Sequence, residues 1–476
     1  MKWLLAVAIL GLAAPALAHV GSPDIFYEAD AGAYHVLVSI VPPDVIPGLA
    51  ALNVRVTNAS VSELHVLSLP LTADNSAFPP TPDLAERSLQ DEHAFSGHLW
   101  LMSTGSWQVK LLISGEAGEA TLAVPVAALP TRVAPMGTAL TVTLFGLLWL
   151  LVHGLVAIVA AAVREGALEP GSSAAPADKS SARRSALVTS LVLALVVFGG
   201  ARWWSASAQV YAQSVYKPLA LAARVEAGRL QLSLAEPGWL PFRKLDDFVP
   251  DHGHLMHLFI VKVPALDRLW HLHPDETAPA HFEHNLPSMS AGTYALYADV
   301  VHEDGLAETL TSTLTLDAVD GAALAGDDAS GEAPPVPLAT SQTVTLPDGA
   351  TLTWQKPNAA LRAGETIDFR FTVSKNGAPS ADLQPYMGML AHAAILAADG
   401  SVFVHLHPSG SVPMAALAVA QGSATTGVHT GHHMSESGAS QIAFPYGFPH
   451  AGTYRIFVQL RRGGQVQTAA FDTRVD

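Results

Sequence analysis

Cysteine is absent from this chain of 476 residues. Its absence excludes a disulfide framework, zinc fingers with thiolate ligands and a thiol nucleophile. A site for a soft transition metal must therefore use the imidazole nitrogen of histidine or the thioether sulfur of methionine. The chain holds 21 His and 9 Met, so both kinds of ligand are available.

Positive charge is scarce. Lys and Arg number 25 against 41 Asp and Glu, which gives a formal net charge of -16. A surface of this sign repels nucleic acid and attracts cations, so we expect a metal cation and no nucleic acid among the partners. A Ser/His/Asp pattern, a Gly-rich phosphate loop and a His-Glu-x-x-His helix are also missing. Enzymatic activity stays open, and a non-enzymatic role is favoured.

Apolar runs, in contrast, are prominent. Half of the residues are hydrophobic and the mean hydropathy is +0.30, which is high for a soluble protein. Residues 1–18 have the pattern of a secretory signal peptide, with Lys2, an apolar stretch and Ala-Leu-Ala before the cut. Cleavage there would make His19 the N-terminus, where its α-amine and ring nitrogen can chelate a metal together. We favour the plainer interpretation, that His19 is simply the residue after the cut.

Two later runs are long enough to cross a bilayer. Residues 138–163 are almost wholly apolar, and 186–204 end in Arg-Trp-Trp, which suits a membrane interface. The segment 164–185 between them carries Lys and Arg and is expected to face the cytoplasm. We therefore expect a bacterial inner-membrane protein with two passes and with its N- and C-terminal domains in the periplasm.

The remaining sequence is organised as β-structure. Short alternating strands separated by Pro, Gly, Asn and Asp predict a mainly β protein with three immunoglobulin-like β-sandwich domains beside the two transmembrane α-helices. The expected domains are 19–134, 218–317 and 343–476. The segment 318–342 is rich in Ala, Gly, Asp and Pro and is expected to be a linker without a packed core.

The last two domains are copies of one unit. His271-Leu-His-Pro in the first recurs as His405-Leu-His-Pro in the second. A strand beginning at His257 precedes the first copy, a strand beginning at His392 precedes the second, and an Ala-Gly-Thr-Tyr sequence follows both. The feature that the copies share most visibly is histidine, the commonest protein ligand for borderline transition metals.

The spacing of these histidines predicts how they cluster. Residues two apart in a strand point to the same face, and the proline that follows tends to end the strand at the rim of a sheet. If each preceding strand pairs with the His-x-His strand, a third imidazole joins each pair. The candidate metal ligands are His257, His271 and His273 in one domain and His392, His405 and His407 in the other.

Further candidates make the two copies unequal. His254 lies directly upstream in the first copy, and Asp299 and His302 follow its Gly-Thr-Tyr strand. The matching positions in the second copy are Gln459 and Arg462, so two metal sites would not be identical.

The second copy has methionine-rich features of its own. Met387-Gly-Met precedes its first histidine, a plausible environment for Cu(I), although methionine is also an ordinary core residue. An insertion of 26 residues in this copy contains Met414 and the cluster His429-Thr-Gly-His-His-Met. That cluster is compatible with loose metal capture and equally with a solvated loop.

Three hypotheses remain at this point. In the first, the histidines bind a transition metal, with copper as the tentative cofactor, for delivery, storage or tolerance. The ion would dissociate when the imidazoles protonate, below about pH 6. In the second, the sandwiches are metal-free interaction modules whose histidines only pack and form hydrogen bonds. In the third, the first domain is a copper oxidoreductase that uses His19. We rank them in this order.

Part of the chain resembles known families. The stretch Gly97-His-Leu-Trp-Leu-Met-Ser-Thr-Gly-Ser-Trp107, with the apolar strand that begins at Leu122, resembles YtkA-like and FixH-like periplasmic domains. That resemblance implies an immunoglobulin-like sandwich and copper delivery to a periplasmic or membrane metalloprotein. A Pro-rich stretch that begins at Phe78 departs from the pattern. The Ala18-His19 dipeptide also looks like the mature start of CopC-type copper proteins.

The duplicated unit has a resemblance of its own. The His254-Leu-Met-His and His271-Leu-His-Pro sequences and their counterparts look like an uncharacterised set of bacterial secreted or membrane proteins. Members of that set often occur beside heavy-metal-binding modules, so this resemblance implies a fold and a metal-related context.

Overall fold

The structure is a computed structural model. It describes residues 24–71, 80–166, 168–239, 243–336, 341–422 and 439–476. The expected signal peptide, His19 and the histidine cluster that begins at His429 lie outside these residues. The chain divides into two compact units, one made of residues up to Leu129 together with Lys217–Asp476 and the other made of Pro130–Tyr216.

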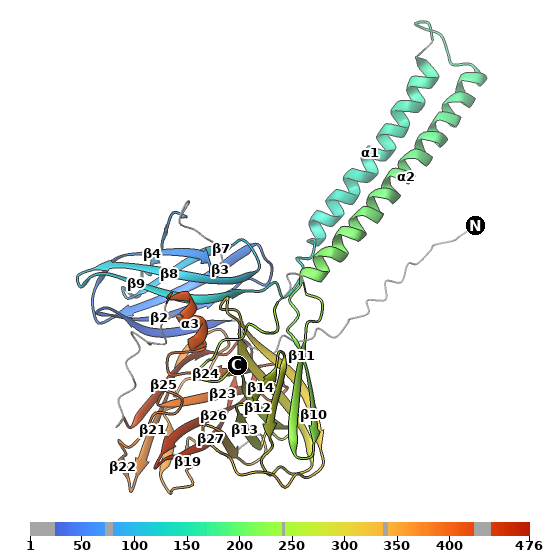
Figure 1. Ribbon diagram of the computed structural model, residues 1–476. Coiled ribbons are helices and arrows are strands. Elements are labelled where there is room, and N and C mark those ends of the chain that lie inside the picture. The colour runs from blue at the N-terminus through green and yellow to red at the C-terminus, as the bar shows by residue number, and fades with distance from the viewer. Residues whose placement is uncertain (1–23, 72–79, 167, 240–242, 337–340, 423–438) are drawn as a thin grey trace. The chain divides into compact units, whose positions relative to one another are not determined.

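The smaller unit is a pair of long helices, α1 (Thr138–Glu165) and α2 (Pro176–Ser214), which lie side by side in Figure 1. Both are long and apolar enough to cross a membrane. The second helix is longer than the expected 186–204, because Pro176 suits a first helical turn and Asp178 accepts a hydrogen bond from the N–H of Ala175. The basic residues Lys179, Arg183 and Arg184 therefore lie in the first turns of α2 and not in a loop.

The N-terminal sandwich confirms the expected fold class for the first domain. Strand alternation explains it: Tyr34, Val36, Val38 and Ile40 of β2 point into the core and the residues between them do not. One sheet has the order β1 (Ile25–Ala31), β2 (Tyr34–Val41), β3 (Gly48–Thr57), β7 (Ala94–Leu101) and β6 (Glu86–Arg87). The other has the order β5 (Asp83–Leu84), β4 (Val61–Pro70), β8 (Gly105–Gly115) and β9 (Gly118–Ala128).

The first repeat is also a sandwich of two antiparallel sheets. The outer sheet consists of β10 (Ala220–Glu226), β11 (Arg229–Ala235), β15 (His281–Asn285) and β14 (Asp275–Ala278). The inner sheet has the order β17 (Ala307–Leu316), β16 (Gly292–Val301), β12 (His257–Val263), β13 (Arg268–Leu272) and β18 (Ala329–Glu332). The strand β18 belongs to the segment 318–342, which therefore differs from the expected linker: its Ala329 is buried and pairs with His271.

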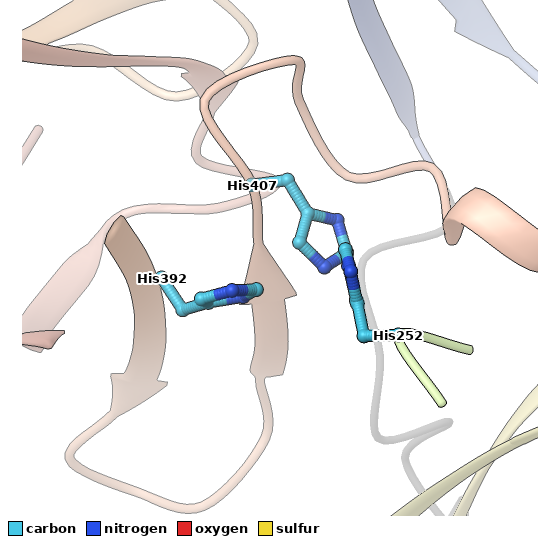
Figure 2. A group of neighbouring side chains, drawn as sticks. All are labelled: His252, His392 and His407. Atoms are coloured by element: carbon cyan, nitrogen blue, oxygen red, sulfur yellow. The ribbon is translucent and has the colours of Figure 1, made fainter. Parts of the chain in front are cut away.

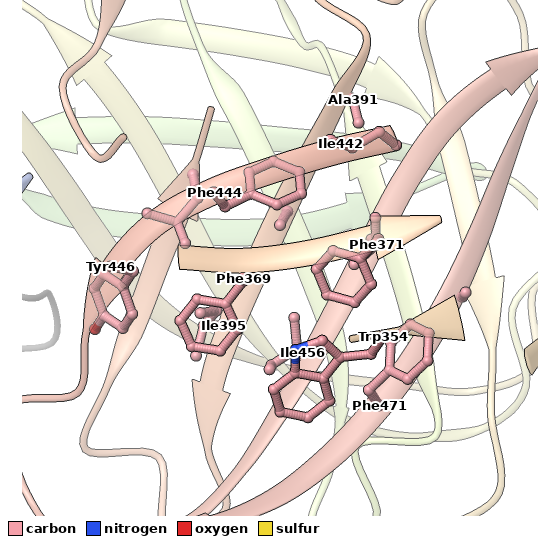
Figure 3. Close-up of a cluster of buried hydrophobic side chains, with 14 of the residues drawn as sticks. Trp354, Phe369, Phe371, Ala391, Ile395, Ile442, Phe444, Tyr446, Ile456 and Phe471 are labelled. Atoms are coloured by element: carbon pink, nitrogen blue, oxygen red, sulfur yellow. The ribbon is translucent and has the colours of Figure 1, made fainter. Parts of the chain in front are cut away.

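The second repeat has the same design. Its outer sheet contains β19 (Thr343–Thr345), β20 (Thr351–Trp354), β21 (Thr366–Lys375), β22 (Ala378–Pro379) and, paired with β21, β25 (Gln441–Gly447). Its inner sheet has the order β24 (Phe403–Leu406), β23 (Ala391–Ala397), β26 (Gly452–Arg462) and β27 (Gln465–Val475). The core between the sheets is rich in aromatic side chains, with Trp354, Phe369, Phe371 and Phe471 in mutual contact (Figure 3).

The inner sheets of the two repeats pack against each other. Every residue of β23 and the first five of β12 are buried, because each strand faces its own core on one side and the other repeat on the other. Tyr297 and Phe403 stack across this interface with ring centroids 4.3 Å apart and planes 3° from parallel. Burial of both faces of these sheets fixes the end of each His-bearing strand against its counterpart.

A short helix of the insertion links all three sandwiches. Helix α3 (Met414–Ala420) contributes Met414 and Leu417 to the core of the N-terminal sandwich. The N–H of its Ala415 donates to Oδ1 of Asp251 in the first repeat over 2.8 Å. Helix α3, which belongs to the second repeat in sequence, therefore contacts both the N-terminal sandwich and the first repeat.

Candidate metal centre

Eight imidazole rings gather where the two inner sheets meet. The rings are linked by centroid separations between 4.0 and 6.1 Å and belong to His252, His254, His257, His271, His273, His392, His405 and His407. Six of them were expected from the His-x-His pattern and the strand that precedes it. The duplicated strand ends bring both sets to one place, because the repeats pack through the same sheets.

In the first repeat, the three expected ligands converge. His257 lies at the start of β12, His271 lies on β13 and His273 directly follows that strand. One nitrogen from each ring lies within 4.8 Å of the others, and all three residues are buried. Nitrogens bound to one ion at about 2.0–2.1 Å lie closer together than this limit, so the three rings would have to close in around an ion.

In the second repeat, the cluster is composed differently from the expectation. The nitrogens that lie within 4.8 Å of one another belong to His392, His407 and His252, and His252 comes from the first repeat (Figure 2). His405 does not join this group of three, yet its Nε2 lies 3.2 Å from Nδ1 of His392. It therefore stays adjacent to the cluster. The predicted trio of His392, His405 and His407 has to be corrected by adding a histidine that crosses the interface.

The hydrogen bonds of the first cluster fix where the ring protons lie. The carbonyl oxygen of Asp251 can only accept, so Nε2 of His257 donates to it over 3.0 Å. Nδ1 of His271 donates to Oε1 of Gln459 over 2.9 Å. The Gln459 amide is oriented by its own N–H, which donates to the hydroxyl of Thr468. Both ring protons therefore point away from the space between the two histidines. The remaining nitrogens, Nδ1 of His257 and Nε2 of His271, face each other at 3.1 Å, and each carries a lone pair.

The contacts that run from the Asp251 carbonyl through His257 and His271 to Gln459 need one more N–H donor than the two neutral rings supply. Between the Asp251 carbonyl and the Gln459 amide oxygen there are three close contacts, but two neutral imidazoles supply only two N–H groups. With the Gln459 amide held in this orientation by its 3.4 Å hydrogen bond to Thr468, exchanging the imidazole tautomers only moves the mismatch to another contact. Two nitrogens bound to one ion in a tetrahedral arrangement are about 3.3 Å apart, so a shared metal relieves the contact without moving the rings far.

The second repeat reproduces this arrangement. Nε2 of His392 donates to the carbonyl of Tyr386 over 3.1 Å, and Nδ1 of His392 faces Nε2 of His405 at 3.2 Å. Nδ1 of His405 lies 3.5 Å from a carboxylate oxygen of Asp299. Burial raises the pKa of Asp299 to about 7, against a hydrogen bond from Thr309 that lowers it. A protonated Asp299 can supply the missing proton here, which the amide oxygen of Gln459 cannot do in the first repeat.

Each cluster also contains a buried nitrogen with no hydrogen-bond partner among the described residues. These are Nε2 of His273 and Nε2 of His407. The other ring nitrogen of His273 lies 3.1 Å from Asp328, and that of His407 lies 3.3 Å from the carbonyl of Val412. Burial of an unpaired polar nitrogen is unfavourable by about 1–3 kcal/mol, and a metal ion would offset that penalty.

Burial keeps these imidazoles neutral. Desolvation, followed by the neighbouring imidazoles, lowers the pKa well below its ordinary value for His257, His271, His392, His405 and His407. Neutral rings offer their lone pairs to a metal, and proton-driven release would need a pH lower than the expected 6.

His273 is held neutral in a different way. Burial lowers its pKa although the carboxylate of Asp328 opposes the change. Burial alone would raise the pKa of Asp328, but hydrogen bonds from His273 and His284 hold it at about 2. A neutral His273 that donates its Nδ1 proton to an ionised Asp328 satisfies both groups. A carboxylate behind a ligating imidazole orients the ring and raises its basicity.

The groups behind the ligands are exchanged between the repeats. Asp299 pairs with His257 in the sheet register of the first repeat, and Gln459 pairs with His392 in the second, so these two positions correspond. Each nevertheless contacts a histidine of the other repeat, Asp299 facing His405 and Gln459 facing His271. The two copies differ at this position as expected, with Asp299 in the first and Gln459 in the second. Each of these side chains contacts a histidine of the other repeat.

The remaining candidates have other surroundings. His254 stacks on His273 with centroids 4.0 Å apart, and its Nε2 lies 3.4 Å from Asp327, at the edge of the centre. His302 does not take part in the clusters: its ring nitrogens contact Asp247 at 2.7 Å and Glu308 at 3.1 Å. The structure therefore places His302 in an ion-pair network of its own, apart from both histidine clusters.

Sequence reasoning missed His252. Single-strand periodicity cannot find it, since it lies in a turn and its partners belong to the other repeat. A signal was nevertheless present: Asp-His-Gly-His before β12 aligns with Tyr-Met-Gly-Met before β23, which marks the same turn with metal-ligating side chains in both copies.

The comparisons with known proteins give a family model for the two repeats and distant matches among solved structures. No curated protein matches the chain. Among solved structures, a tetra-tandem repeat from the extending region of a large adhesion protein is 7% identical, with a TM-score of 0.16, and the match covers 94% of this chain and 82% of that one. A putative membrane anchored protein from Corynebacterium diphtheriae is 9% identical, with a TM-score of 0.16, and coverage is 95% and 94%. The two repeats, residues 221–318 and 342–476, match the model of a family described as a domain of unknown function (DUF8832).

Proposed function

We propose that the interface between the two repeats binds transition-metal ions, one in each histidine cluster, and that copper is the ion it carries. The observation that supports this most directly is the pair of acceptor nitrogens in the first repeat, Nδ1 of His257 and Nε2 of His271 at 3.1 Å. A metal is the partner that both lone pairs can share. Copper is favoured because divalent copper binds nitrogen sites more tightly than the other first-row divalent ions do.

The alternative is a metal-free interaction module in which the histidines only pack. It leaves the proton shortage of the first repeat unexplained, and it leaves Nε2 of His273 and of His407 buried without a hydrogen-bond partner in the part of the chain that the structure describes. A single core histidine is ordinarily satisfied by a carbonyl or a hydroxyl. Here His257, His271, His273 and His392 direct their protons outward, which leaves their other ring nitrogens turned toward the clusters, as a bound cation requires.

The membrane context completes the proposal. The two long helices fit a two-pass anchor in a bacterial inner membrane, and the signal peptide expected over 1–18 would place both sandwich-bearing regions in the periplasm. A metal-binding protein held there would store copper, confer tolerance, or deliver the ion to a periplasmic or membrane metalloprotein.

Metal content of the whole chain tests the proposal. An isolated 343–476 fragment is unsuitable, because His252 of the first repeat belongs to the cluster of the second. We expect the purified protein in detergent to bind close to two copper ions by elemental analysis. His271→Ala with His273→Ala should remove about one of them, and an exposed histidine outside the centre, His281→Ala, is the matched control. A wild-type protein that binds no copper at micromolar concentrations would refute the proposal.

The lack of cysteine makes the topology directly testable. A single cysteine introduced at Ser62 or at Ser173 would be the only thiol in the chain, and both positions are exposed. In intact spheroplasts we expect a membrane-impermeant maleimide to label Ser62→Cys and to leave Ser173→Cys unlabelled until the membrane is opened. The reverse pattern would exclude a periplasmic N-terminal sandwich.

A further inference from the structure

The turns that precede β12 and β23 have the same conformation. In each, the first and fourth residues exchange two backbone hydrogen bonds, Asp251 with His254 at 2.9 and 2.9 Å, and Tyr386 with Met389 at 2.7 and 3.1 Å. The third residue is glycine with a positive φ in both turns. The residues at the second position, His252 and Met387, therefore correspond in three dimensions as well as in the alignment.

The second position of each turn has a backbone that L-residues rarely adopt. His252 has a φ of 51° and Met387 a φ of 50°, and neither is glycine. A non-glycine residue in this region is uncommon and is retained where the surroundings over-determine it, often to aim a side chain. For His252 the target is evident, because its ring reaches the cluster of the other repeat (Figure 2).

Met387 reaches across the interface in the opposite direction. Its side chain is buried and packs with Ala329 of the first repeat, and Ala329 is the strand partner of His271. The neighbouring Tyr386 confirms the direction of the turn, since its hydroxyl donates to the carbonyl of Asp327 over 2.7 Å and lies 3.5 Å from Nδ1 of His271. The turn of the second repeat thus lies beside the histidines of the first.

We infer that Met387 provides a thioether ligand to the metal held by His257, His271 and His273, in the place that His252 occupies in the other cluster. This inference rests on the proposed metal binding and assigns the two sites different ligand chemistry. Three imidazoles with a thioether suit Cu(I), whereas the purely imidazole site of the second repeat suits Cu(II) or Zn(II) as well. In a chain without thiolates, this sulfur would make the first-repeat site the softer of the two.

Cuprous titration of the whole protein tests the inference. Under anaerobic, reducing conditions, wild type, Met387→Leu and Met389→Leu compete with a chromophoric Cu(I) chelator. Met389 is the matched control, because it corresponds to His254 at the edge of the centre and not to His252. We expect Met387→Leu to weaken one of two Cu(I) sites by at least about tenfold and Met389→Leu to change neither.

X-ray absorption of wild type loaded with one cuprous ion gives a second readout that does not depend on a folded variant. We expect sulfur in the copper coordination shell, and we expect it to be lost in Met387→Leu. Cu(I) bound by nitrogen alone, or unchanged affinity in a folded Met387→Leu, would overturn the thioether assignment and leave the proposed metal centre standing. Absence of any cuprous binding in wild type would overturn both.

Discussion

His271 of the first repeat donates a hydrogen bond of 2.9 Å to the side-chain oxygen of Gln459 in the second. The residues are 188 positions apart in the chain, yet the bond decides which nitrogen of His271 carries its lone pair. Because Nδ1 donates to the amide, Nε2 is the nitrogen available to a metal. A residue of one repeat thus sets the tautomer of a histidine in the other, and that histidine is one of the proposed ligands.

Replacement of Gln459 tests this relationship. Gln459→Leu should keep the packing but remove the acceptor, so the affinity of the first-repeat site for copper should fall by about 10–100-fold. Gln465→Leu, at an exposed position on the next strand, is the control and should have no effect. Equal affinities in wild type and Gln459→Leu, measured by chelator competition, would show that the amide does not orient the ligand.

His252→Ala is expected to act on the opposite site. The variant changes the first repeat in sequence but should weaken metal binding by the cluster of His392 and His407. His254→Ala, two residues away in the same turn, should have the smaller effect because its ring stacks at the edge of the centre. Isothermal titration with Co(II) or Cu(II) on variants that already lack His271 and His273 isolates this site. Equal losses for the two alanine variants would contradict the crossing arrangement.

Metal binding should stabilise the repeats against heat. An ion that binds only the folded state stabilises it by about 2.7 kcal/mol when its free concentration is 100 times the dissociation constant. We therefore expect the unfolding temperature of the repeats to rise with copper in wild type, to rise less in His273→Ala, and to stay constant in a variant that lacks both clusters. Differential scanning calorimetry with and without a chelator provides the measurement, and a rise in the variant without clusters would point to binding elsewhere.

The ion-pair network of His302 predicts a pH dependence unrelated to the metal. Burial lowers the pKa of His302, but hydrogen bonds to Glu308 and Asp247 outweigh it, so its pKa is raised above the ordinary 6.5. A raised pKa in the folded state means that the protonated ring stabilises the fold fully below the unfolded value and that this stabilisation is lost as the pH rises through the folded value.

His302→Gln should therefore destabilise the first repeat by about 2 kcal/mol at pH 5.5 and by less at pH 8.5. Urea denaturation of both proteins with a chelator present measures the difference at each pH. A difference that grows with pH would contradict a charged His302. His281→Gln, on an exposed strand position, controls for loss of an imidazole in general.

Much of this architecture could be predicted from the sequence. The alternation in β2 and the duplicated His-Leu-His-Pro sequence are local signals. The sandwiches, the repeat and the convergence of His257, His271 and His273 can therefore be predicted from the sequence. His252 was not, because its role depends on which surfaces the repeats bury against each other. The segment 318–342 looked like a linker for a similar reason: Asp328 is polar in sequence but pairs with His273 and His284 only after folding.

The depth of the histidine rings has a consequence for exchange. His271 and His392 are completely inaccessible to solvent, and the cluster of His392 and His407 also includes His252 from the other side of the interface. We expect an ion bound beside these rings to be shielded from solvent, so its residence time would depend on how often the two inner sheets part locally as well as on bond strength. If the proposed delivery role holds, an acceptor protein would gain access to the ion by promoting local opening of the interface between the two repeats.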